Sequence, residues 1–132
     1  MKAIDTNVLV RFLVGDDENQ AKKVYDLFKG AEQTGERFFV PLLVVLELLW
    51  VLESVYDVPR REILESLNEL TFMSVLRFES QDVIHRFIDA AYGNLFDLSD
   101  LLIAHSSKDS GCDKVLTFDK RASSHELFEM IE

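Results

Sequence analysis

Cysteine, proline and glycine are all scarce in this sequence of 132 residues, which holds one cysteine, two prolines and five glycines. A single cysteine excludes an intramolecular disulfide, which fits a reducing compartment and predicts a cytoplasmic protein with Cys112 buried. So few prolines and glycines leave no linker, repeat or low-complexity tract that would divide the chain. We therefore expect residues 1–132 to form a single domain, long enough to fold without a disulfide or a metal.

Long hydrophobic runs are missing as well. The longest apolar stretch, residues 38–52, contains Glu47 and follows Arg37, so it is too short and too charged to span a bilayer. The first seven residues lack the apolar core of a signal peptide. These absences exclude secreted and membrane-spanning classes, and we expect no membrane partner.

Positive charge is outnumbered, because 14 Lys and Arg stand against 24 Asp and Glu and give a formal net charge of −10. A protein that coats nucleic acid shows a basic face, so the balance disfavours that class. It leaves open an enzyme that meets phosphate groups through a bound cation. It also suits a basic protein partner.

Short apolar segments alternate with amphipathic helices along the chain. Residues 8–14 fit either a short helix or a loop, and the helix that follows Asp16 or Asp17 is expected to end at Gly30. Residues 41–54 are apolar on nearly all sides and predict a buried helix. Strands are expected at residues 2–4, 37–40, 72–77 and 114–118, and further helices after Pro59, after Ser80 and at residues 99–108. This alternation predicts an α/β domain with a mainly parallel sheet.

Acidic residues stand at three places where a ligand is expected. Asp5 and Asp119 each follow an expected strand, and ligands of open α/β sheets bind at the carboxyl ends of strands. Asp100 lies in the first turn of an apolar helix. Simpler roles are an Asx turn for Asp119, a favourable helix dipole for Asp100, and a helix N-cap for Asp97.

Glu47 is the strongest single indication of a site. No other polar side chain occurs between Leu42 and Leu52, and no Lys or Arg lies three or four residues away. An ionised carboxylate in a buried helix must be paired, must bind a cation, or must be protonated. Clustered carboxylates without a His or Cys set suit Mg²⁺ or Mn²⁺. Such an ion activates water for phosphodiester hydrolysis.

Four motifs stand in order along essentially the whole chain: Asp5-Thr6-Asn7, residues 44–52 around Glu47, Asp97-Leu98-Ser99-Asp100, and residues 111–119 ending at Asp119. Together they resemble the PIN-domain nucleases, and among these the VapC-type ribonuclease toxins of prokaryotic toxin–antitoxin pairs. The resemblance implies a three-layer α/β/α Rossmann-like fold with a mainly parallel central sheet. It also implies Mg²⁺- or Mn²⁺-dependent cleavage of RNA, a homodimer, and inhibition by a VapB-like antitoxin.

The resemblance carries the catalytic metal ligands over to Asp5, Glu47, Asp100 and Asp119. It also makes Thr6, Asn7 and Thr117 residues that hold these carboxylates in place, and we add Asp97 to that supporting group.

Two other functions stay open. One is a PIN-like module that binds RNA or protein without catalysis. The other is a phosphatase with Asp5 as nucleophile. It is disfavoured because such sites generally have a second Asp two residues later, and this chain has Asn7 there. Arg11, Lys120 and Arg121 either touch RNA phosphates or are solvated surface residues. The three histidines lack metal-ligand spacing and are expected to be neither ligands nor bases: His85, His105 and His125.

Overall fold

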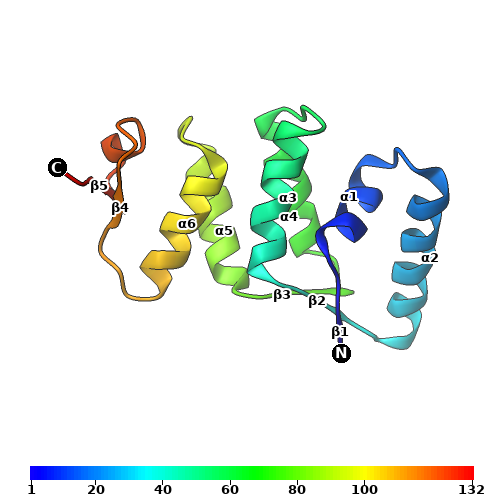
Figure 1. The fold of residues 1–132 in the computed structure, drawn as a ribbon. Coiled ribbons are helices and arrows are strands. Elements are labelled where there is room, and N and C mark those ends of the chain that lie inside the picture. The colour runs from blue at the N-terminus through cyan, green and yellow to red at the C-terminus, as the bar shows by residue number, and fades with distance from the viewer. The chain divides into compact units, whose positions relative to one another are not determined.

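The structure is a computed structural model that describes residues 1–132, and the chain divides into two compact units. The first unit is Met1–Gln81 and the second is Asp82–Glu132. Helices α1 to α4 belong to the first unit (Figure 1). Helix α6 and nearly all of α5 belong to the second.

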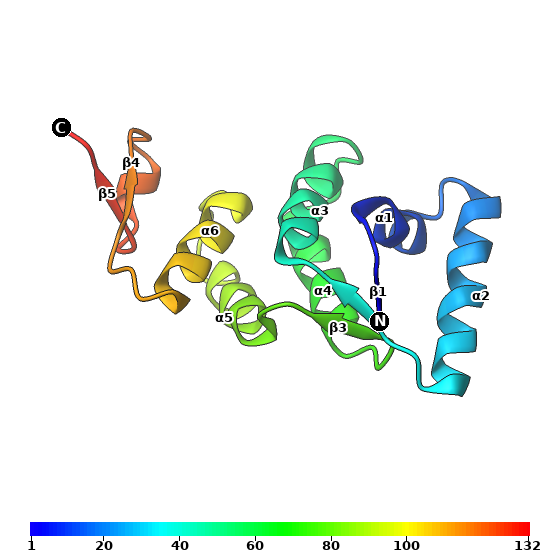
Figure 2. The same ribbon diagram turned by 60° about the horizontal axis from the view of Figure 1, so that its bottom comes forward.

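The sheet of the first unit contains three parallel strands in the order β1-β2-β3 (Figure 2). They are β1 (Lys2–Ala3), β2 (Phe38–Val40) and β3 (Leu76–Phe78), with Lys2 opposite Phe38 and Phe38 opposite Leu76. Because all three strands run the same way, their carboxyl ends lie along one edge of the sheet. That edge is where the sequence places Asp5.

Helix α1 (Thr6–Val14) settles the ambiguity of residues 8–14 in favour of a helix. Helix α2 (Glu18–Thr34) begins where Asp17 accepts a hydrogen bond from the Gln20 backbone N–H at 3.0 Å. The prediction that it ends at Gly30 is wrong. The helix continues to Gly35, whose φ of +78° is the left-handed conformation that ends helices.

Helix α3 (Leu42–Ser54) follows Pro41 and runs beside α4 (Arg60–Thr71) in both views of Figures 1 and 2. One face of α3 is buried, through Val45, Leu48, Leu49 and Leu52. The opposite face carries Leu43, which is 77% exposed, so the prediction of a helix buried on all sides is wrong. A helix at the surface of a protein packs only one stripe of its side chains.

The second unit contains α5 (Gln81–Ala91, its first residue being the last of the first unit), α6 (Leu98–Asp109), β4 (Val115–Thr117), a short 3₁₀ helix (Ala122–Ser124) and β5 (Phe128–Met130). Strands β4 and β5 pair in parallel, with Val115 opposite Phe128. Ala104, Ala122 and Phe128 form a small core beneath them. Strand β5 was not expected from the sequence, because its stability comes from pairing with β4 rather than from a pattern of its own.

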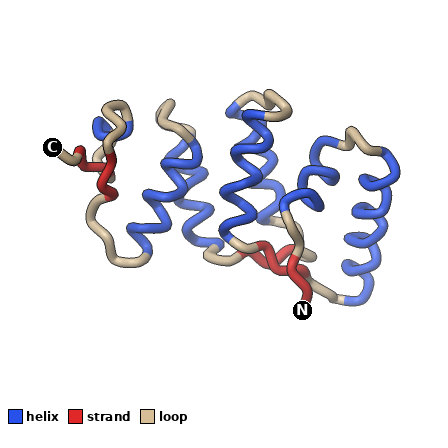
Figure 3. The backbone as a smooth tube through the Cα atoms, in the orientation of Figure 1, coloured by secondary structure: helices blue, strands red, loops and turns tan.

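All strand pairs in the protein are parallel, and the strands are short segments between longer helices (Figure 3). The predicted α/β class with a mainly parallel sheet is therefore confirmed. Cys112, in contrast, is exposed, so its predicted burial is wrong; it lies in the loop after α6 rather than in an element with a packed face. None of the helices has the length and apolar character needed to cross a membrane.

Candidate active site

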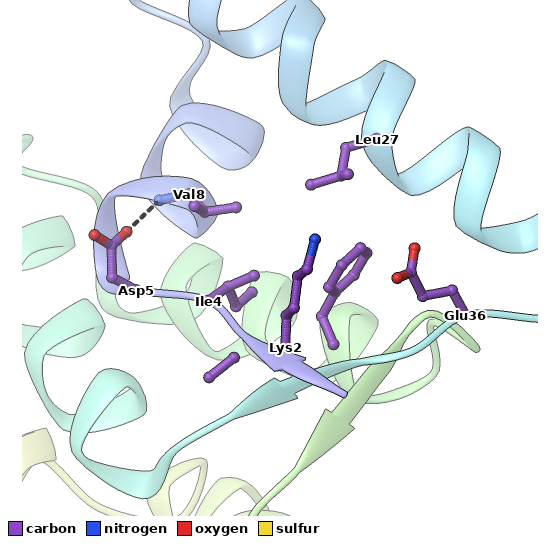
Figure 4. Close-up of a pocket in the computed structure, with 8 residues that line it drawn as sticks. Lys2, Ile4, Asp5, Val8, Leu27 and Glu36 are labelled. Carbon is purple, nitrogen blue, oxygen red and sulfur yellow. Dashed lines mark hydrogen bonds between the residues drawn. The ribbon is translucent and has the colours of Figure 1, made fainter.

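Asp5 stands at the carboxyl end of β1, as the sequence analysis expected. It is the N-cap of α1, where its Oδ1 accepts a hydrogen bond from the Val8 backbone N–H at 3.2 Å. Its exposed side chain lies at one end of a pocket of about 490 Å³ that Lys2 and Leu27 also line (Figure 4). The Asp5 carboxylate is thus held by the helix and remains open to solvent.

Glu47 is exposed in α3 and forms no ion pair. The inference that its carboxylate is buried, and must therefore find a cation, is wrong because Glu47 lies on the unpacked side of α3. Leu43 and Trp50, four residues before it and three after, share that side, and Trp50 is 58% exposed. The remaining support for Glu47 as a metal ligand is its position in the second turn of α3, a helix that starts at the carboxyl ends of the strands.

Glu79 is a third carboxylate at this edge, and the sequence analysis missed it. It follows β3 directly, and its Oε1 accepts a hydrogen bond from the Leu42 backbone N–H at 2.8 Å. This bond caps α3, whose N-cap residue Pro41 has no side-chain acceptor. Glu79 directly follows β3 in the structure, whereas the strand expected at residues 72–77 ended one residue too early to single it out.

Asp97 and Asp100 begin helix α6 in the second unit. Asp97 is the N-cap, with its Oδ1 accepting from the Asp100 backbone N–H at 2.9 Å, so its predicted capping role is confirmed. Asp100 is half-buried in the first turn. The two carboxylates therefore lie on the same short stretch of helix.

Asp119 follows β4 and organises the loop after it. Its Oδ1 accepts hydrogen bonds from the backbone N–H groups of Arg121 at 2.8 Å and Ala122 at 3.2 Å, which is the Asx turn considered above. The Thr117 hydroxyl accepts from the Asp119 backbone N–H at 2.9 Å and fixes the start of the turn. Thr117 thus positions Asp119 through its backbone rather than through its carboxylate.

Asp100 lies within electrostatic reach of two other acids of the second unit, Asp97 and Asp119. Burial raises the pKa of Asp100, and the negative charges of Asp97 and Asp119 raise it further. A cation near Asp100 would remove this penalty on its ionised form. No three His, Cys, Asp or Glu side chains come close enough together to form a metal-binding group by themselves. Asp97 and Asp119 each use only Oδ1 in the hydrogen bonds above, which leaves hard oxygen donors of the type Mg²⁺ prefers.

The basic side chains considered as phosphate contacts differ in their surroundings. Arg11 donates to Gln20 Oε1 at 2.7 Å, to Asp16 at 3.2 Å and to the Tyr56 hydroxyl at 3.3 Å, so it ties the last turn of α1 to the start of α2 and to two loops. Arg121 donates to the Leu95 carbonyl at 3.1 Å and forms no ion pair. The Arg11 side chain therefore has a structural role, whereas most N–H donors of the Arg121 side chain are free to bind another group.

Comparison with known proteins places these residues in a family. The model of the PIN domain family matches residues 2–126. The chain belongs to the PIN domain family. This PIN domain is also 30% identical over 121 residues to a "VapC ribonuclease" of Aquifex aeolicus (strain VF5), a match that covers 92% of this chain and 89% of the relative.

The family match confirms the resemblance and the predicted PIN fold. It runs through both units and takes in every predicted site residue, from Asp5 and Glu47 in the first to Asp100 and Asp119 in the second. Within the second unit, Asp97 and Asp119 each lie within electrostatic reach of Asp100. The assignment of ligands among these PIN-domain acids stays a prediction.

Proposed function

We propose that this PIN domain is a Mg²⁺- or Mn²⁺-dependent endoribonuclease and the toxin of a toxin–antitoxin pair. The relative named as a ribonuclease supports RNA as the substrate. The structural observation that carries the proposal is the placement of Asp5 after β1 and of Asp119 after β4, each held through Oδ1 by a backbone N–H. Burial and two neighbouring carboxylates raise the pKa of Asp100, and a bound cation would favour its ionised form.

The ligands that we propose are Asp5, Glu47, Asp100 and Asp119. When bound, the ion supplies an activated water and neutralises charge on the attacked phosphate. The chain's own residues prepare for it in three ways: Asp5 is held by the Val8 N–H, Asp119 by its own turn, and Asp100 by the helix that Asp97 caps. Thr6, Asn7 and Thr117 are proposed to keep these acids in place.

We also propose a homodimer, a VapB-like antitoxin as protein partner, and a cytoplasmic location, where the RNA substrate is found. The net charge of −10 suits a basic segment of such a partner. Leu43 and Trp50 on the exposed face of α3 supply apolar area of the kind found at interfaces.

Cleavage of mixed tRNA and rRNA by purified, antitoxin-free protein tests the activity, with Mg²⁺ or Mn²⁺ and an EDTA control. Loss of a metal ligand costs more than loss of a group that only orients one, so Asp5→Asn should slow cleavage by about 100-fold or more. Asp89→Asn, an exposed acid on α5, is the matched control and should cleave like the wild type.

Metal binding is tested separately by thermal melting. Mn²⁺ at about 100 times its Kd should stabilise the folded protein by about 2.7 kcal/mol, and Asp100→Asn should lose most of this gain. Stabilisation by Mn²⁺ without any cleavage would favour the non-catalytic binding module, since the exposure of Glu47 removes one argument against it. Cleavage that survives both EDTA and Asp5→Asn would come from a contaminant.

A further inference from the structure

A small pocket in the second unit is formed by the segments that carry Asp97 and Asp119 of the candidate site. Its volume is about 180 Å³, and it is lined by Leu95, Phe96, Arg121 and Ser124. Phe96 directly precedes Asp97, and Arg121 lies two residues after Asp119. The two segments that form the pocket are therefore the segments that carry these acids.

Arg121 is placed in this pocket by two interactions. Its backbone N–H donates to Asp119 Oδ1 at 2.8 Å, and its side-chain Nη2 donates to the Leu95 carbonyl at 3.1 Å. The second bond ties the guanidinium to the opposite segment of the pocket wall. An arginine has five N–H donors, so this single side-chain bond leaves the others available.

The charge of Arg121 is not neutralised by a protein carboxylate. The four ion pairs of the structure involve Arg11, Lys22, Arg61 and Arg86, and none involves Arg121. Asp119 belongs to the same turn, yet it accepts only from backbone N–H groups. An unpaired, oriented guanidinium fork matches the oxygens of a phosphate.

The rest of the pocket supplies apolar and hydroxyl groups. Leu95 is 75% exposed at its mouth, and Phe96 contributes an aromatic ring whose centroid lies 4.8 Å from that of His125. Ser124 donates its hydroxyl hydrogen to the Arg121 carbonyl at 2.7 Å, so its oxygen can still accept. A nucleotide combines an anionic phosphate with a flat base that packs on apolar and aromatic side chains.

We propose that the pocket of Leu95, Phe96, Arg121 and Ser124 binds one nucleotide of a single-stranded RNA, with Arg121 on its phosphate. The inference rests on the proposed function and specifies where substrate is held beside the site. It gives a chain of net charge −10 one oriented cation for a phosphate, in the same turn as Asp119. Arg121 is a binding residue in this proposal and takes no part in the chemical step.

The test measures binding of a fluorescein-labelled, mixed-sequence single-stranded RNA of ten nucleotides to the full chain by anisotropy. An Asp5→Asn background keeps cleavage slow while Mg²⁺ is present. Arg121→Ala should raise the Kd about 10-fold, the loss expected for a charged hydrogen bond. It should also lower the slope of log Kd against log salt by about 0.7, the value for one phosphate contact on a single strand.

Three variants control for charge, geometry and folding. Arg37→Ala removes the same charge before β2, at the edge of the sheet away from the strands' carboxyl ends, and should change the Kd less than about twofold. Arg121→Lys should recover the salt slope and only part of the affinity, because lysine lacks the fork. Leu95→Glu places a negative charge on an exposed side chain and should weaken binding in a protein that folds normally.

Equal effects of Arg121→Ala and Arg37→Ala on the Kd would overturn the inference, as would an unchanged salt slope. In the cleavage assay Arg121→Ala should raise KM with kcat nearly constant, and a fall in kcat alone would also overturn it. The proposed function alone fails if the wild type cuts no RNA while Arg121→Ala still changes the Kd and the salt slope as expected. If the wild type cuts RNA and Arg121→Ala changes neither Kd nor KM, only this inference fails.

Discussion

At the scale of single residues, the candidate carboxylates serve local structure with one oxygen. Asp5 and Asp97 cap helices, and Asp119 closes a turn, in each case through Oδ1. Such bonds hold a carboxylate in one orientation without consuming its second oxygen. A structural role for these acids therefore does not compete with ligation, and it pre-positions the oxygens that would bind a metal.

His105 in α6 links folding to pH. Its Nε2 is buried and has no hydrogen-bond partner. Burial lowers the pKa of His105, and the nearby positive charges of His125, Lys108 and Arg86 lower it further. At pH values well above 6.5 both folded and unfolded chains hold this imidazole neutral, so it makes no pH-dependent contribution there.

As pH falls through 6.5, the unfolded chain takes up a proton at this position before the folded protein does. We predict that His105 lowers the free energy of unfolding as pH falls from about 7 to 5. His105→Gln should flatten that dependence, as measured by urea unfolding at several pH values. Parallel curves for the wild type and the variant would show that His105 contributes nothing to it.

At the scale of elements, the glycines of α2 make a matched pair. Gly30 lies exposed inside the helix, and outside its own helical backbone no atom lies within 4 Å of the position that an alanine Cβ would take there. Gly35, in contrast, ends the helix at a φ of +78°. Gly30→Ala should stabilise the protein by about 0.8 kcal/mol, because glycine inside a helix costs conformational entropy. Gly35→Ala should destabilise it by about 1 kcal/mol, because alanine is strained in the left-handed region.

Thermal melting measures this pair, and the two variants should move Tm in opposite directions by about 3 °C each. A rise in Tm for Gly35→Ala would mean that α2 ends before Gly35. That result would support the original prediction that the helix ends at Gly30.

At the scale of the whole molecule, the two compact units raise the question of whether the PIN domain unfolds as one body. We propose that residues 1–132 are a single domain, because the family match continues through both units. Trp50 is the only tryptophan and lies in the first unit, and Cys112 is the only cysteine and lies exposed in the second. The chain thus carries one unique probe in each unit.

Urea unfolding followed by Trp50 emission and by a dye on Cys112 should give the same midpoint and the same slope. Coincident transitions are the behaviour of a single cooperative domain. Two separate midpoints would instead show that the units fold independently.

How much of the fold could be predicted differs between elements. Helix starts were predictable at Asp17 and Asp97, because each cap is a bond within three residues of the chain. The end of α2 was not, since both Gly30 and Gly35 are plausible stops and only the conformation at Gly35 separates them. Strand β5 escaped because its stability comes from pairing with β4 rather than from its own pattern.

The candidate site divides in the same way. The identity and order of Asp5, Glu47, Asp100 and Asp119 come from the sequence alone, because family motifs and strand ends are local patterns. The burial of a residue cannot be read from the sequence in this way, and for this reason Glu47 was expected to be buried and is found exposed. The pairing of Arg121 with the Leu95 carbonyl, 26 residues apart, depends on how the chain folds back. Contacts between distant segments are set by packing, and no local pattern encodes them.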